Sequence, residues 1–181
     1  NKVLFDKDKS KIIAFRDKDT TLYVIPDGVT SIGDGAFWGC TSLTSLVIPE
    51  SVTSIGDYAF VGCDSLTDIV ILDRVTRIWE FEFCCCESLT DIVLPEGVTS
   101  IGDRAFHNCS ALSSIVIPDS VTSIGESAFK NCISLKSFEI PSSVTSIGFV
   151  AFSGCKSLSS LVIPASVVNL NGNPFCGWYG E

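Results

Sequence analysis

The sequence predicts a repeat solenoid that consists mainly of short β-strands, because one pattern of 23 residues recurs through most of its 181 residues. The period never slips, as one valine column demonstrates: Val29, Val52, Val75, Val98, Val121, Val144 and Val167. Two further columns keep the same period, one of phenylalanine (Phe37, Phe60, Phe83, Phe106, Phe129, Phe152 and Phe175) and one of cysteine (Cys40, Cys63, Cys86, Cys109, Cys132 and Cys155). Such self-similarity is the signature of stacked repeats.

The repeat has the consensus V-T-S-I-G-x-x-A-F-x-x-C-x-S-L-x-S-L-x-I-P-x-S, and eight of these 23 positions are apolar in nearly every copy. A single copy cannot bury so many apolar side chains, whereas stacked copies bury them in continuous ladders. Stacking at the spacing of β-strands predicts an elongated molecule with a rise of roughly 5 Å per repeat.

The chain divides into three expected parts. Residues 1–26 should form an N-terminal β cap and the first strand, residues 27–166 the regular repeats, and residues 167–181 an incomplete last repeat, which indicates truncation. Within the first part, charged turns separate three stretches with strand character: 2–5, 11–16 and 21–26.

Two short extended segments are predicted in each repeat. The segment L-x-S-L-x-I-P, for instance residues 43–49, alternates and ends in proline, as a short strand of a parallel sheet does. We expect these strands on the concave face. The V-T-S-I segment is β-branched and predicts a second extended stretch that ends at a glycine, so the convex face should hold turns or short extended segments and little helix.

One column predicts a fixed turn, because glycine and asparagine alternate there at Gly39, Gly62, Asn108, Asn131 and Gly154. These two residue types tolerate the left-handed backbone region best. The third repeat places Cys85 in this column, which predicts local strain or a rearranged turn.

The phrase I-P-x-S-V-T-S-I-G-x-x-A-F-x-G-C-x-S-L, almost complete over residues 48–66, resembles the Treponema pallidum-type leucine-rich repeats of BspA-like proteins. The resemblance covers residues 22 to about 178, and the preceding segment V-L-F-D-K-D-K-S-K-I-I-A-F is also similar to that family. It implies a leucine-rich-repeat right-handed superhelix. It further implies a bacterial, secreted or surface-attached protein with a role in adhesion to host matrix proteins or to other bacteria.

The third repeat departs from this pattern. Leu72 replaces the proline, Trp79 the glycine and Glu82 the alanine, and three consecutive cysteines, Cys84, Cys85 and Cys86, replace x-G-C. We interpret Trp79, Phe81 and Glu82 as a candidate binding patch.

A second candidate site is the outward column of the L-x-S-L-x-I strand: Val24, Val47, Val70, Val93, Val116, Glu139 and Val162. If these valines point away from the core, they form an exposed apolar stripe large enough to mark an interaction site. The alternative is structural, because valine ladders also stabilise a sheet. We take Val47, Val70, Val93 and Val116, with the adjacent Asp68 and Asp91, as the candidate ligand-binding residues.

The other polar columns leave alternatives open. The six cysteines of the column are expected to be buried thiols, with disulfides between adjacent coils as the alternative, whereas Cys84, Cys85 and Cys176 should be more exposed or reactive. A zinc site at the three consecutive cysteines is disfavoured, because adjacent ligands cannot easily reach one ion. Two acidic columns could hold calcium or a basic partner, or only cap turns and solvate strand ends: Asp27, Glu50, Asp73, Glu96, Asp119; and Asp34, Asp57, Glu80, Asp103, Glu126.

Charge and composition exclude several functions. The net charge is -9, and the repeats after residue 20 hold 17 of the 21 acidic side chains, which argues against nucleic acid as a partner. No apolar run is long enough for membrane insertion. The single histidine, His107, occupies a variable position that should face solvent, and no catalytic or metal motif appears, so no enzyme activity and no cofactor are expected.

The sequence therefore predicts an extracellular, adhesin-like module that binds a protein ligand, with host extracellular matrix proteins among the candidates. The alternative is a structural spacer or assembly domain without a ligand of its own. We expect a monomer or a weak end-to-end dimer, because an incomplete last coil would leave an open sheet edge.

Overall fold

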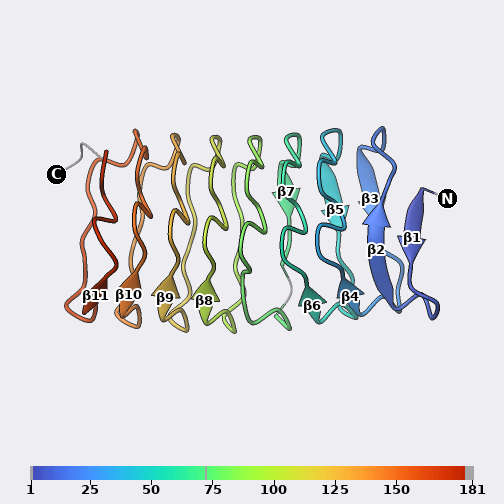
Figure 1. The fold of residues 1–181 in the computed structure, drawn as a ribbon, viewed down its shortest axis with the longest axis horizontal. Coiled ribbons are helices and arrows are strands. Elements are labelled where there is room, and N and C mark those ends of the chain that lie inside the picture. The colour runs from blue at the N-terminus through green and yellow to red at the C-terminus, as the bar shows by residue number, and fades with distance from the viewer. Residues whose placement is uncertain (1, 72, 178–181) are drawn as a thin grey trace.

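The computed structural model describes residues 2–71 and 73–177 as a β-solenoid whose coils stack along one long axis (Figure 1). All elements assigned within these residues are β-strands, and β1 and β11 lie at opposite ends of the array. The predicted repeat solenoid with parallel strands is thus confirmed. Leu72 and the last four residues of the expected incomplete repeat lie outside the described residues. The described part of the chain contains no helix of the length and hydropathy needed to cross a membrane.

The N-terminal end of the core is covered by an antiparallel hairpin of β1 (Val3–Phe5) and β2 (Lys11–Phe15). The strand β2 then pairs in parallel with β4 (Ser31–Ile32), which joins the hairpin to the first coil. Ile12 and Phe15 of β2 are buried against the array. The apolar ladder of the repeats is therefore shielded from water at this end.

The V-T-S-I segments form the more regular side of the solenoid, here called the Ser-Ile sheet. Its strands after β4 are β6 (Ser54–Ile55), β8 (Ser100–Ile101), β9 (Ser123–Ile124), β10 (Ser146–Ile147) and β11 (Asn169–Leu170). Paired strands are parallel and in register. In β8 and β9, for example, serine faces serine and isoleucine faces isoleucine, whereas β11 places Asn169 against Ser146 and Leu170 against Ile147. A threonine hydroxyl also donates to the threonine carbonyl of the preceding coil, for example Thr122 to Thr99 at 3.1 Å.

The L-x-S-L-x-I segments form the other side, here called the valine face. Its strands are β3 (Leu22–Val24), β5 (Ser45–Val47) and β7 (Asp68–Ile69), and single parallel bridges from Val70 to Val93 and from Val93 to Val116 continue it. We expected the principal strands here, but the pairing is less regular than in the Ser-Ile sheet. Most copies end in a proline, which has no N–H to donate to the next coil.

Phenylalanine rings stack along the centre of the core. Successive rings from Phe37 to Phe152 lie with centroids 5.3 to 5.6 Å apart, and the stack extends to Phe15 at one end and Phe175 at the other. The spacing matches the rise of one coil, since each repeat contributes one ring at the same position. Aromatic pairs at this distance are favourable beyond the area that they bury.

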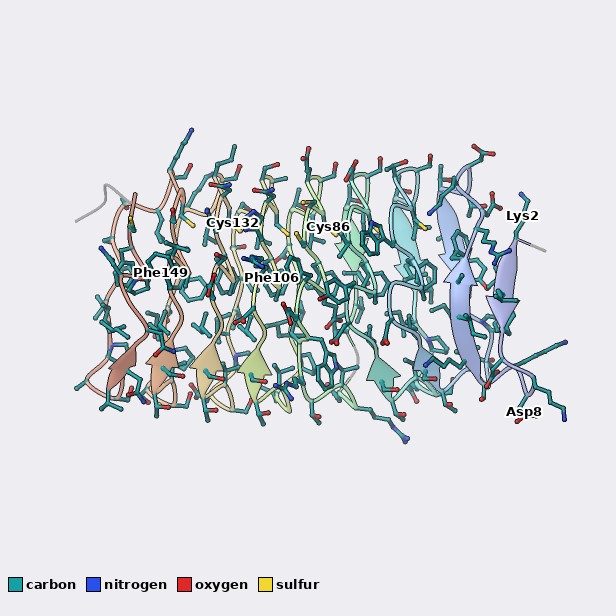
Figure 2. The ribbon with its side chains drawn as sticks, viewed as in Figure 1. Lys2, Asp8, Cys86, Phe106, Cys132 and Phe149 are labelled. Carbon is teal, nitrogen blue, oxygen red and sulfur yellow. The ribbon has the colours of Figure 1, made fainter. Side chains whose placement is uncertain are left out.

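The cysteine column has a hydrogen-bonding role in addition to packing. From Cys63 to Cys155, each thiol donates to the phenylalanine carbonyl 26 residues earlier, at 3.1 to 3.3 Å. The sulfur atoms recur from coil to coil, with Cys86 and Cys132 labelled in Figure 2. All six cysteines of the column are buried free thiols, as expected, and burial raises the pKa of Cys86, Cys109 and Cys132.

Outside the column the expectation was wrong for one cysteine. Cys85 is partly exposed and Cys176 is exposed, but Cys84 is buried. Burial, together with a smaller effect of the Cys85 sulfur 3.5 Å away, raises the pKa of the Cys84 thiol to about 12. Since the thiolate is the nucleophile, Cys84 is an unreactive thiol at neutral pH.

The six coils that contain residues 35 to 154 each have two left-handed turn positions. The first is the predicted column, where φ is between 60 and 74° from Gly39 to Gly154. Cys85 has a φ of 61°, so the turn of the third repeat is not rearranged, and a cysteine adopts the strained conformation. The second column lies four residues earlier and was not predicted: Gly35, Tyr58, Phe81, Arg104, Ser127 and Val150.

Val150 is the most strained of these residues, because it is β-branched and has a φ of 49°. Replacement of Val150 with Gly is expected to raise the free energy of unfolding by about 1 kcal/mol, since glycine occupies this region without a steric cost. Chemical denaturation of the purified protein measures the change. The same replacement at exposed Val168, which lies outside the left-handed columns, is the control and should not stabilise; a loss of stability in the Val150 variant would contradict the assignment of strain.

Candidate functional site

The valine face carries an exposed apolar stripe. Val47, Val70, Val93 and Val116 lie side by side on successive coils, and their exposed fractions rise from 48% at Val47 to 78% at Val116. The residues next to them in sequence, such as Leu46 and Ile48, are buried, as the alternation of a strand requires. The structure thus brings together the four valines that the sequence analysis singled out, and Val24 and Val162 are exposed in the same column.

Carboxylates border this stripe on both sides. Asp68 and Asp91 are exposed and lie two residues before Val70 and Val93, on the same face of the strand. Asp68 pairs in register with Ser45 of β5. On the other side, Asp73 and Glu96 line a groove of ≈ 540 Å³ together with Val70 and Val93. A second groove of ≈ 520 Å³ continues past Val116 to Glu139. The result is an apolar surface with a mainly acidic rim, to which Arg74 adds a cation at the first groove.

The third repeat forms a separate surface on the side of the Ser-Ile sheet, between β6 and β8. Trp79 is 37% exposed, and the Arg77 guanidinium lies 4.6 Å from the centre of its ring. Phe81 is partly exposed and stacks on Tyr58 with ring centroids 5.2 Å apart, while Arg104 covers its ring at 5.0 Å. A third groove lies beside Trp79. None of the residues that line it also lines one of the two grooves of the valine face, so the two predicted sites are distinct.

Two aromatic residues of this surface were missed in the sequence. Tyr58 stacks on Phe81 and also on Trp38, at 6.3 Å, which produces a strip of three aromatic rings outside the core. The available signal was the spacing of 23 residues between Tyr58 and Phe81. The column shared by Tyr58 and Phe81 contains no consensus residue, and for this reason Tyr58 was not recognised as a neighbour of Phe81.

Glu82, which we expected on this surface, is buried with an exposed fraction of 0%. It replaces the small alanine of the repeat, and its Oε2 accepts a hydrogen bond from the backbone N–H of Trp79 at 2.8 Å. A ligand cannot contact Glu82 in this conformation. Its role at the site is to hold the backbone of Trp79.

The Trp79–Glu82 hydrogen bond replaces a regular link between coils. In other coils the glycine at the position of Trp79 donates its N–H to an isoleucine carbonyl of the preceding coil, as Gly102 does to Ile78 at 2.8 Å. The glycine is required because a Cβ at Gly102 would lie 2.7 Å from backbone atoms of that coil. At the position of Trp79 this backbone link is absent, and the Ser-Ile sheet is interrupted between β6 and β8.

Burial determines the charge state of Glu82. Desolvation raises the pKa of its carboxyl to about 8; the nearby charge of Asp57 adds to this effect, and the hydrogen bond from Trp79 opposes it. The Oε1 atom is buried without a hydrogen-bond partner. The carboxyl is therefore mostly protonated at pH 7, and the third repeat contains a neutral glutamic acid.

His107 is less exposed than expected. It is partly buried, and burial lowers the pKa of its imidazole, as do the positive charges of Lys130 and Arg104. The ring is thus neutral at pH 7 and lies next to two cations.

Comparisons with known proteins agree with this architecture. The model of the BspA type leucine-rich repeat region matches in six copies, over residues 11–136 and 99–178. A comparison with curated proteins gave no match.

Among solved structures, the leucine-rich repeat protein of T. pallidum is 34% identical with a TM-score of 0.86, and the match covers 98% of this chain and 86% of that protein. A leucine-rich cell surface protein of Faecalibacterium prausnitzii is 34% identical with a TM-score of 0.71, over 88% of this chain and 52% of that one. A leucine-rich repeat protein of Eubacterium ventriosum is 28% identical with a TM-score of 0.86, over 97% and 48%. The chain spans about half of the latter two proteins.

Proposed function

Because the chain belongs to the BspA-type leucine-rich repeat family, we propose that it is an extracellular protein-recognition module that binds its ligand through the valine face. The observation that carries this proposal is the exposed stripe of Val47, Val70, Val93 and Val116. Apolar side chains in a contiguous exposed row lose contact with water when a partner covers them, which favours association. The description of the F. prausnitzii relative as a cell surface protein supports the extracellular location.

The acidic rim adds specificity to this surface. Asp68 and Asp91 on one side, and Asp73 and Glu96 on the other, surround the apolar centre. Interfaces commonly have this arrangement, with an apolar centre that provides affinity and a polar border that selects the partner. We expect a ligand with an apolar strip between basic side chains, and host extracellular matrix proteins are the first class to test.

The test is surface binding of the purified chain to immobilised collagen, laminin and fibronectin. Simultaneous replacement of Val70, Val93 and Val116 with Ser should weaken saturable binding at least tenfold, since it removes the apolar centre and leaves the buried side chains in place. Replacement of Val168, an exposed valine outside the stripe, with Ser is the matched control and should bind like the parent. Unchanged affinity of the triple variant, with an unaltered melting temperature, would refute the assignment.

The third repeat can be tested in the same assay. The double variant Trp79→Gly and Glu82→Ala restores the consensus and should rejoin the two parts of the Ser-Ile sheet. If Trp79 and Phe81 contribute to recognition, this variant loses binding although the valine face is intact. Absence of binding in the parent chain to every matrix protein would favour the alternative, a structural spacer of a larger surface protein.

A further inference from the structure

A groove of ≈ 630 Å³ crosses the Ser-Ile sheet over β8, β9 and β10, on a surface distinct from the valine face. It extends from Trp79 to Phe149, which is labelled at the C-terminal part of the array in Figure 2. Both residues depart from the repeat. Trp79 stands where other coils have glycine, and Phe149 stands where they have an acidic residue. The two aromatic side chains stand three coils apart along the groove, and Asp57 and Asn171 line it one coil beyond them.

The floor of the groove is polar and lies close to the backbone. Ser100, Ser123 and Ser146 present partly exposed side chains in a row, one from each strand. Two residues after each serine, on the same face, the chain has a glycine, which carries no side chain above the sheet: Gly102, Gly125 and Gly148. Hydroxyl groups can donate hydrogen bonds to, and accept them from, the amide groups of an extended chain.

The wall of the groove is acidic. Asp57, Glu80, Asp103 and Glu126 line it against one cation, Arg77, which stacks on Trp79. Glu126 forms an ion pair with Arg104 at 3.7 Å. Among the residues that the structure describes, Asp57, Glu80 and Asp103 have no ion-pair partner. The groove thus has three carboxylates without an ion pair on successive coils, and Arg77 lines it with them.

We propose that this groove binds an extended, lysine- or arginine-rich segment of a protein partner. The carboxylates attract its cationic groups, the serines pair with its backbone, and the faces of Trp79 and Phe149 contact its aliphatic stems and charges at the two ends. The two aromatic residues are three coils apart, which corresponds to about 15 Å, or about five extended residues.

The geometry disfavours calcium as the occupant. Calcium needs several oxygen ligands around one point, and in the described part of the chain no three His, Cys, Asp or Glu side chains gather in this way. The carboxylates of the wall come from successive coils instead. This arrangement suits a ligand whose charges are themselves distributed along a chain.

The experiment is titration of fluorescein-labelled pentalysine, at about 50 mM salt, into the chain and two variants with matched charge changes. The double variant Glu80→Gln and Asp103→Asn removes two charges from the groove and keeps the oxygen of Asp103 that accepts the Glu126 N–H. The control Asp73→Asn and Glu96→Gln removes two charges from the valine face. We expect saturable one-to-one binding that weakens at least tenfold in the groove variant and less than twofold in the control.

Three outcomes would overturn the proposal: no saturable binding, equal weakening in both variants, or equally tight binding of spermine, which carries the charge without a peptide backbone. Replacement of Phe149 with Ser should weaken binding of pentalysine without affecting matrix proteins, because Phe149 does not line the grooves of the valine face. The variant with Glu80 and Asp103 replaced should still bind matrix proteins through the valine face. The two proposals are therefore tested separately, one by the pentalysine assay and the other by the matrix assay.

Discussion

Replacement of Glu82 with Gln is expected to raise the free energy of unfolding by about 3 kcal/mol at pH 7. Unfolding returns the buried carboxyl to water, where its pKa is close to 4.5 and it ionises, whereas the folded state raises the pKa to about 8. At pH 7 this difference favours the unfolded chain. Glutamine has a similar shape and an oxygen that can accept the Trp79 N–H, but it does not ionise in either state.

The sign of the pH dependence follows from the same shift. Between pH 4.5 and pH 8 the folded chain binds the proton of Glu82 and the unfolded chain does not, so the contribution of Glu82 to stability decreases as the pH rises. The contribution is fully present below pH 4.5. The parent and the Gln variant should therefore have similar stability near pH 4 and diverge up to pH 8.

Denaturant unfolding at pH 4, 6 and 8 measures this difference. The matched control is Glu80→Gln, which removes one carboxylate from an exposed position two residues away. That variant should follow the parent at every pH. A gap between the parent and the Glu82 variant that stays constant from pH 4 to pH 8 would show that Glu82 is not a protonated buried acid.

Replacement of Gly125 with Ala is expected to lower the free energy of unfolding by about 3 kcal/mol. A Cβ at this position would lie 2.6 Å from the backbone nitrogen of Asp103 and 2.6 Å from the carbonyl carbon of Gly102. Backbone atoms cannot move aside as a flexible side chain can, so the coils must separate. The hydrogen bond from Gly125 to the Ile101 carbonyl, 2.9 Å long, would break.

The third repeat shows what happens when this glycine is replaced by a residue with a side chain. Trp79 occupies the equivalent position, and there the sheet is interrupted and Glu82 supplies the lost hydrogen-bond acceptor. The Ala variant at residue 125 has no such acceptor, because residue 128 is an alanine. Its destabilisation should therefore be uncompensated.

Gly97→Ala is the matched control for this prediction. The nearest atom that a Cβ at Gly97 would meet is the Asp73 carbonyl oxygen at 3.5 Å, which is an ordinary contact. This variant should be as stable as the parent or slightly more stable, because alanine restricts the unfolded chain. Equal destabilisation by both alanines, measured by urea unfolding, would contradict the assignment of a coil-to-coil clash at Gly125.

Much of the fold could be read from local patterns. The period of 23 residues located the phenylalanine and cysteine ladders, because every coil contributes the same position to the core. Strand alternation identified the exposed valines, since Leu46 and Ile48 had to face inwards. Glycine and asparagine revealed the first left-handed column. The second column stayed hidden, because Tyr58, Arg104 and Val150 share no preference for that conformation.

The candidate sites depended more on the tertiary structure. Glu82 looked like a surface acid, and only the packing of its coil determined that it is buried and mostly neutral. Cys84 similarly appeared exposed, although its side chain lies in the interior. The groove between Trp79 and Phe149 could not be anticipated, because it requires two irregular residues three coils apart to border the same face.

The sequence by itself therefore determined the period, the identity of the core columns and the two faces of the solenoid. These features follow from repetition and alternation, which are local properties of the chain. The tertiary structure decided the protonation of Glu82, the interruption of the Ser-Ile sheet and the grouping of residues on the two surfaces that we propose as binding sites. Desolvation, the distance between backbones of adjacent coils and the grouping of charges depend on residues that are remote in the sequence, and only stacking brings those residues together.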